Sequence, residues 1–425
     1  KGQMARTMVG MAVALCALAA QAGFDPNEHA VLKTDRADGR YLATRGVVQD
    51  MMRQEKAKLS FDGGLTHDGF LAWRGKVRAK LRELLGYPDD PAQPVPPRLL
   101  FRQRRDGYTL EKWEHYPMPN TVIPYLMLVP DGVSSNRPGP AVLCLPGTWH
   151  SKESLAGEPE LDEAYRAPSS FRVRPENRMA LHYCKGGITA IAVDNPGFCE
   201  VSDLIREANN WHLGFSGAAD IGQYLMNLGM SYMGYAAYTN DRLLDALRVD
   251  PRIDRRRLAV SGHSLGAWTA GHLMALNEDL AAAVMNQGIY RWREAAAART
   301  RPDEKGVRPP VWGLFYCIPG LYRYFDMPDI QAAIAPRPAL YCEGVPERDR
   351  LEVYLPAYRI AGAPENLTIV PFAKYADPKS RYVGKLPEGL REDDEVWIYY
   401  SNDAQDHYFK ADVAVPWLRS KLGLK

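Results

Sequence analysis

The sequence lacks an excess of either charge. Its 425 residues include 53 Lys and Arg against 51 Asp and Glu, which gives a formal net charge of +2. Nucleic-acid binding requires a clustered basic surface, and this balance gives no electrostatic case for it. With 46% hydrophobic and 24% charged residues, the composition also excludes a disordered tail protein, a collagen-like chain and a polytopic membrane protein. It indicates an ordinary globular protein, long enough for a large core and a pocket.

Metal-binding and redox patterns are also missing from the sequence. None of the six cysteines forms a Cys-x-x-Cys pair, and there is no His-Glu-x-x-His motif or His/Cys cluster with ligand spacing. Cys144 and Cys342 lie in short apolar runs, so we expect both to be buried strand thiols. We expect no metal and no cofactor.

The N-terminal segment has the form of a signal peptide. Arg6 precedes an apolar stretch at 8–20, and Ala20-Gln21-Ala22 has the small-x-small form of a cleavage site. Residues 1–24 are therefore interpreted as a signal peptide or an ordinary N-terminal helix. A signal peptide at 4–22 would send the chain to the periplasm or outside the cell; without it, a cytoplasmic protein is expected. No membrane span is expected in the mature chain.

Residues 25–98 are predicted to be a helical N-terminal extension. Apolar residues recur there at spacings of three and four, which indicates one buried helical face: Phe70, Trp73, Val77, Leu81, Leu84 and Leu85. Gly86 and Pro88 follow and stop that helix. The proline-rich run after them is interpreted as a linker.

Residues 99–425 are predicted to form one α/β domain. Short apolar runs indicate strands at 107–116, 122–129, 141–145, 188–193, 258–261, 282–285, 338–341 and 367–370. Helical stretches alternate with them, at 235–247, 265–276 and 353–360. This alternation is typical of a mostly parallel sheet with helices on both faces. We expect about eight strands, the first two forming an antiparallel hairpin at one edge.

The candidate nucleophile is Ser264. It is the central residue of Gly262-His263-Ser264-Leu265-Gly266, between an apolar strand and a helix-forming sequence. This is the strand–turn–helix context of a nucleophile elbow. The two glycines remove side chains that would collide in so tight a turn. The serine would then stand at a helix N-terminus, which favours a developing anion.

The candidate general base is His407, which is identified by elimination. The order along the chain in this architecture is serine, acid, histidine. Only His272 and His407 follow Ser264, and His272 lies within the helix that leaves the elbow, about two turns away. His407 lies in a loop before a final amphipathic helix at 413–424.

The orienting acid is expected on the loop after the strand at 338–341. Glu347 is a few residues past the strand end, where the loop can turn back towards the histidine, and is the first choice. Asp349 is the alternative, while Glu343 is expected to be still on the strand. The carboxylate would hold the imidazole tautomer and stabilise the imidazolium.

The oxyanion hole is assigned to the backbone N–H groups of Leu265 and Thr148. Leu265 directly follows the nucleophile, and Thr148 follows Gly147, which lets the backbone approach a substrate oxygen closely.

Substrate-pocket candidates are Trp149, His263 and Trp211. Two insertions, near 204–231 and 373–404, carry many aromatic residues and lie where lids commonly sit. Their rings suit either stacking on sugars or packing on one another.

The chain resembles α/β-hydrolases, and within them the bacterial branch of acetyl-xylan esterases and dienelactone-hydrolase-like proteins. The resemblance covers about 100–425 and rests on the stretches Ala190–Asp203, Asp241–Ala267, Ile334–Leu340 and Ala361–Val370. It implies an α/β-hydrolase fold and a triad of Ser264, Glu347 and His407. The chain departs from the usual pattern in having Pro146-Gly147 where His-Gly is common, and Glu347 where an aspartate is common.

These features predict a serine carboxylic-ester hydrolase that acts through an acyl-enzyme on acylated carbohydrate or small esters. A serine peptidase or lactonase is the alternative on the same triad. A non-catalytic binding protein on this fold would be expected to have a broken triad. The expected partner is a small-molecule or carbohydrate ester, with no nucleic acid.

Overall fold

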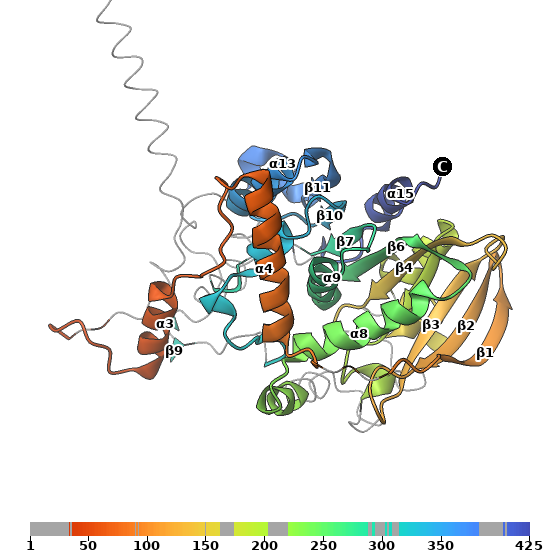
Figure 1. The fold of residues 1–425 in the computed structure, drawn as a ribbon, viewed down its shortest axis with the longest axis horizontal. Helices are drawn as coiled ribbons and strands as arrows, with labels where there is room; N and C mark the ends of the chain where they lie inside the picture. Colours follow the sequence, from red (N-terminus) through yellow and green to blue (C-terminus); the bar gives the residue numbers. More distant parts are fainter. Residues whose placement is uncertain are drawn as a thin grey trace, which may run out of the picture.

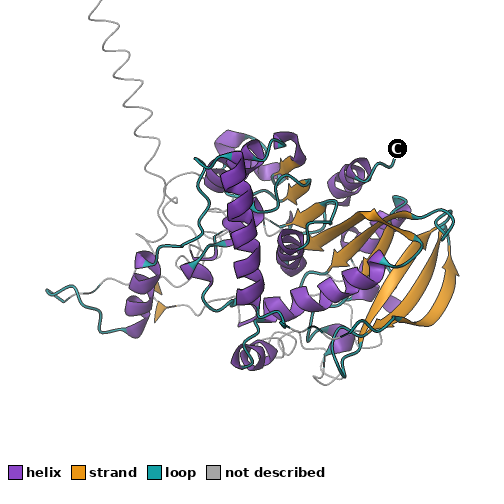
Figure 2. Ribbon diagram, in the orientation of Figure 1, coloured by secondary structure: helices purple, strands orange, loops and turns teal. Residues whose placement is uncertain are grey.

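A nine-stranded sheet forms the centre of the computed structural model (Figures 1 and 2). The structure describes residues 34, 36–89, 91, 93–148, 150–161, 174–202, 220–287, 291–293, 302–303, 306–307, 314–381, 403 and 406–425. The sheet order is β1-β2-β3-β5-β4-β6-β7-β10-β11. Its strands are β1 Arg98–Arg105, β2 Tyr108–His115, β3 Ile123–Pro130, β4 Gly139–Leu145, β5 Thr189–Ala192, β6 Ile253–His263, β7 Ala283–Asn286, β10 Ala339–Cys342 and β11 Leu367–Val370. A separate two-stranded piece pairs β8 Pro302–Asp303 with β9 Gly306–Val307.

The sheet is parallel from β5 to β11 and antiparallel at its other edge. Neighbouring strands pair in parallel through β5, β4, β6, β7, β10 and β11, whereas β1, β2 and β3 are antiparallel to one another and β3 is antiparallel to β5. The predicted mostly parallel sheet and its antiparallel hairpin are confirmed. Cys144 and Cys342 are buried free thiols on β4 and β10, as predicted.

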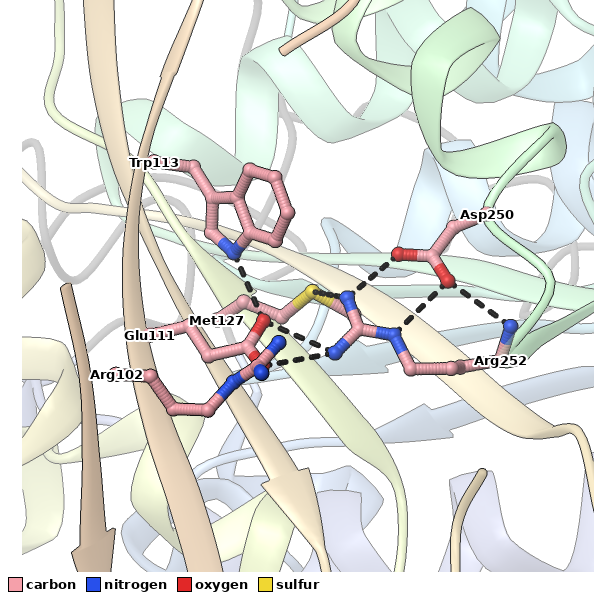
Figure 3. Close-up of polar contacts among 6 residues, drawn as sticks. All are labelled: Arg102, Glu111, Trp113, Met127, Asp250 and Arg252. Atoms are coloured by element: carbon pink, nitrogen blue, oxygen red, sulfur yellow. Dashed lines mark hydrogen bonds and ion pairs between the residues drawn. The ribbon is translucent and has the colours of Figure 1, made fainter. Parts of the chain in front are cut away.

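The sheet has one strand more than predicted, because β1 carries no apolar signal along most of its length. Its sequence Arg-Leu-Leu-Phe-Arg-Gln-Arg-Arg is mostly exposed, as suits a charged edge strand. Arg102 donates to Glu111 on β2 at 2.7 Å. The buried Glu111 carboxylate also accepts from Trp113 Nε1 at 2.8 Å and from Arg252 just before β6 (Figure 3). This network joins the antiparallel edge to the turn that leads into β6.

Helices cover both faces of the sheet. The described helices are α3 Thr44–Gln54, α4 His67–Leu85, α5 Lys152–Ala156, α6 Met179–Lys185, α8 Tyr232–Arg248, α9 Leu265–Leu276, α11 Met327–Ala332, α12 Glu347–Asp349, α13 Leu355–Ile360 and α15 Ala411–Lys421, with a π-helical turn at Arg350–Tyr354. Single 3₁₀ turns lie at Pro159–Leu161, Pro175–Asn177, Cys199–Val201, Leu314–Tyr316, Leu321–Arg323, Pro364–Asn366, Ala373–Tyr375 and Pro378–Ser380. One core contains α4, α8, α9 and α11, and the other contains α5, α6 and α15. Figure 1 shows α15 on the opposite side of the sheet from α8.

The N-terminal helix α4 is part of the main core. Thr66 caps it by accepting from Gly69 N–H. Gly86 ends it in the left-handed conformation, at the stop that the sequence predicts. Its apolar face buries Phe70, Val77 and Leu81 against the core that α8 and α9 share. None of the helices in the described parts of the chain has the length and hydropathy of a membrane span. Residues 1–24, Trp149, Trp211, 204–219 and 382–402 lie outside the described residues.

The buried His272 is expected to make the stability of the protein fall at acidic pH. It is fully buried in α9, with Nδ1 2.7 Å from the carbonyl oxygen of Trp268, and burial lowers its pKa from 6.5 to about 4. Between those values the unfolded chain takes up a proton that the folded chain does not. Stability should therefore fall as the pH falls through this window, by up to about 1.4 kcal/mol per pH unit.

The test is His272→Asn, because asparagine can still donate to the Trp268 carbonyl. Denaturant unfolding at a series of pH values should show a shallower loss of stability below pH 6.5. His67→Asn, at an exposed histidine in α4, serves as the control and should keep the wild-type slope. Equal slopes in all three proteins would contradict the assignment to His272.

Candidate active site

Ser264 occupies a tight turn between β6 and α9. β6 ends at His263 and α9 begins at Leu265, so Ser264 joins them with φ 52° and ψ −118°. A positive φ is costly for a residue with a side chain and is held here by its surroundings. A Cβ on Gly262 would lie 2.1 Å from the carbonyl oxygen of Gly266, and one on Gly266 would lie 2.1 Å from that of Leu145. Only glycine fits at either position. The strand, turn and helix predicted around Ser264 are all present.

His407 is paired with Glu343. His407 lies in the loop that precedes α15, and its Nδ1 is 2.7 Å from Glu343 Oε2. The Glu343 side chain is 1% exposed and that of His407 is 14% exposed. Burial raises the pKa of the Glu343 carboxyl, and the nearby His407 and Lys410 oppose that rise. In the tautomer in which Nδ1 donates to the carboxylate, Nε2 carries no proton and can act as the base.

The structure does not place Glu347 or Asp349 next to His407. The predicted pairing of His407 with Glu347, or with Asp349 as the alternative, is therefore wrong. Glu347 binds Arg350 at 2.9 Å and Arg381 at 2.8 Å. Burial alone would raise the pKa of Glu347, but these two guanidinium groups lower it below its usual value. Asp349 is buried against Arg291, at 2.7 Å. Both carboxylates are ion-pair partners on α12.

Glu343 was missed because it was expected to be still on the strand that β10 forms. The strand stops at Cys342, so Glu343 is the first residue beyond the sheet rather than part of it. Its φ of 71° turns the chain there, and Gly344 follows with φ 78°. The available signal was a carboxylate directly after a buried apolar run and directly before a glycine.

The loop after β4 packs closely against the nucleophile. A Cβ on Gly147 would lie 3.3 Å from Ser264 Cβ and 3.0 Å from the Nδ1 atoms of His263 and His150. Thr148 is the residue after Gly147. Leu265 is the first residue of α9, and the N–H groups in the first turn of a helix have no acceptor within it. The predicted oxyanion donors therefore lie on the two segments that meet at Ser264.

His263 lies inside the site rather than on its rim. It is buried, and its ring centroid is 4.7 Å from that of His407 and 5.6 Å from that of His150. Burial and these neighbours hold the pKa of His263 well below its usual value, so it is neutral. In the described part of the chain, His263, Glu343 and His407 form the one group of His, Cys, Asp or Glu that is close enough to hold a metal ion. Two of its three members already hydrogen-bond each other.

An apolar cavity of about 590 Å³ lies next to α9, the helix that follows Ser264. It is lined by Trp268 of α9, one turn after Ser264, together with Trp292, Tyr316 and Met51. The rings of Trp268 and Trp292 lie 5.2 Å apart, and Tyr316 meets both nearly edge-on. A second cavity, of about 580 Å³, lies at the carboxyl end of β5 and is lined by polar as well as apolar side chains.

Comparison with known proteins shows the fold and the family of this chain. A putative acetyl xylan esterase from Bacteroides fragilis superposes with a TM-score of 0.84 and 36% identity, over 94% of this chain and 100% of that one. A glucuronoyl esterase from Solibacter usitatus shares the fold, with a TM-score of 0.50 and 17% identity over 73% of this chain and 87% of that one. No match was found among curated proteins. The model of the Abhydrolase family matches residues 23–420, and the chain belongs to that family.

Proposed function

We propose that this chain is a serine carboxylic-ester hydrolase in which Ser264 is the nucleophile, His407 the base and Glu343 the orienting acid. The observation that carries the proposal is the 2.7 Å contact between His407 Nδ1 and the buried Glu343 carboxylate. A serine hydroxyl is a poor nucleophile until a base takes its proton, and a histidine oriented by a carboxylate is such a base. Ser264 itself stands at the strained turn that these hydrolases use.

The reaction proceeds in two halves. Ser264 Oγ attacks the ester carbonyl while His407 Nε2 takes its proton, and the N–H groups of Leu265 and Thr148 stabilise the oxyanion. The tetrahedral intermediate collapses, and His407 gives the proton to the departing alcohol. Water then attacks the acyl-enzyme and passes its proton to His407, which returns it to Ser264 as the acid leaves.

The substrate is an acylated carbohydrate of the acetyl-xylan kind, or a small ester. The support is the Bacteroides fragilis protein, which matches along its whole length. The apolar stretch and small-x-small motif within residues 4–22 support export, which would bring the enzyme to polymeric carbohydrate. A peptidase or lactonase is the second candidate, because the same three side chains can serve amides and lactones.

The proposal is tested with a phosphonate probe and a substrate panel. A fluorophosphonate should modify the protein once, and peptide mass spectrometry should place the adduct on Ser264. The enzyme should release acetate from p-nitrophenyl acetate and from acetylated xylan. Cleavage of the small ester alone would keep the triad and remove the carbohydrate assignment. If the fluorophosphonate left Ser264 unmodified, the proposed mechanism would be wrong.

A further inference from the structure

Two consecutive side chains after β5 hold both ends of the loop that follows β4. Asn195 Nδ2 donates to the carbonyl oxygens of Pro146, at 3.1 Å, and Gly147, at 3.2 Å. Asp194 Oδ1 accepts from the backbone N–H of Lys152 at 2.7 Å, and its Oδ2 accepts from Lys152 Nζ at 2.7 Å. The segment from 146 to 152 is therefore attached to β5 at its start and at its end.

The contact of Asn195 with Gly147 fixes the direction of a neighbouring N–H group. The carbonyl of Gly147 and the N–H of Thr148 belong to one peptide plane, and in a trans peptide they point in opposite directions. Because Asn195 and the backbone N–H of His150 both hold that carbonyl, at 3.2 Å each, the Thr148 N–H is directed away from them. The adjoining Gly147 meanwhile lies against Ser264.

The contacts of Asn195 and Asp194 are shielded from water. Asn195 is 5% exposed and Asp194 is 4% exposed, so water does not compete for these hydrogen bonds. An amide is also the group the site requires, because it donates from Nδ2, whereas a carboxylate can only accept. A carboxylate facing two carbonyl oxygens would repel both and rotate the peptide plane.

We propose that Asn195 is a positioning residue for the reaction: it orients the Thr148 N–H as an oxyanion donor. The inference rests on the proposed function, because it assumes that Ser264 forms a tetrahedral intermediate beside Thr148. Asn195 acts only through the loop and does not meet the substrate. Its loss should therefore weaken transition-state binding and leave ground-state binding intact.

The test compares Asn195→Asp with Asn366→Asp. Asn366 makes the same kind of contact, from Nδ2 to the carbonyl oxygen of Pro336 at 2.8 Å, but it lies just before β11, at the amino end of the parallel strands. Active sites are counted by phosphonate titration, so that kcat refers to folded enzyme. In Asn195→Asp, kcat on p-nitrophenyl acetate should fall about 10- to 100-fold with KM unchanged, the range for a misplaced oxyanion donor. Asn366→Asp should keep the wild-type kcat.

A boronic acid inhibitor provides a readout that a structural role would not move. It forms a tetrahedral adduct on the serine, so its affinity should fall by the same factor as kcat/KM in Asn195→Asp. A lower melting temperature with unchanged kcat per titrated site and unchanged boronate affinity would overturn the inference. If Asn195→Asp does not fold, the same measurements are made on Asn195→Ala, which removes the donor without adding a charge. A wild-type enzyme whose Ser264 takes no phosphonate would instead defeat the proposed function, and the inference with it.

Discussion

Glu343→Gln should lower kcat for p-nitrophenyl acetate by about 10⁴-fold, the cost seen when a triad carboxylate becomes an amide. Glu343 Oε2 lies 2.7 Å from His407 Nδ1 in a buried site. The carboxylate both fixes the tautomer with a basic Nε2 and stabilises the imidazolium that forms during attack. Glutamine removes the charge and can present an N–H to Nδ1, which would favour the wrong tautomer.

Glu347→Gln is the matched control. It is the same substitution four residues away, at the carboxylate that the sequence favoured, and it breaks the contacts with Arg350 and Arg381. The substitution should lower the melting temperature and leave kcat close to the wild-type value. Glu343→Asp, which keeps the charge but shortens the reach, should recover part of the activity. A larger loss of kcat in Glu347→Gln than in Glu343→Gln would mean that Glu347, and not Glu343, is the orienting acid.

These two glutamates show what the sequence can and cannot specify at a catalytic site. Ser264 was predictable because glycines at fixed offsets have a steric reason, seen in the 2.1 Å approaches at Gly262 and Gly266. His407 was predictable because only two histidines follow Ser264, and the other, His272, lies within the helix that leaves the elbow. The acid was not, because its place depends on where β10 ends and on a positive φ at Glu343, and no residue type encodes that for a glutamate.

The same contrast holds for the fold. Buried parallel strands such as β4 are continuous apolar runs, and α4 carries an apolar stripe and a terminal glycine, so both were predictable. The edge strand β1 is rich in arginine and is held by cross-strand ion pairs, which leave no apolar alternation to detect. Interactions between distant parts of the chain, such as the contacts of Asn195 with the loop after β4, carry no local signal.

The second large effect is expected at Lys152, whose side chain is completely buried. Its Nζ lies 2.7 Å from Asp194, 2.9 Å from Glu153 and 2.5 Å from Glu200. Burial alone would lower the pKa of Lys152, but the three carboxylates raise it well above its usual value, so the side chain is charged. The ammonium is the common partner of these acids, and a buried carboxylate left without its partner is costly.

Lys152→Met should therefore lower the free energy of unfolding by about 3–5 kcal/mol, the cost of removing one partner from a buried ion pair. Lys112→Met is the control: Lys112 also binds Glu200, at 2.8 Å, but both side chains are partly exposed and Glu200 would keep Lys152. An exposed pair of this kind contributes about 0–1 kcal/mol. Denaturant unfolding at neutral pH distinguishes the two variants, and the deficit of Lys152→Met should shrink on acidification, because protonation removes the unpaired negative charge. A deficit that stayed constant with pH would mean that lost packing, rather than unpaired carboxylates, destabilises the variant. In that case the cluster would fill space beside the loop that follows β4 without fixing that loop electrostatically.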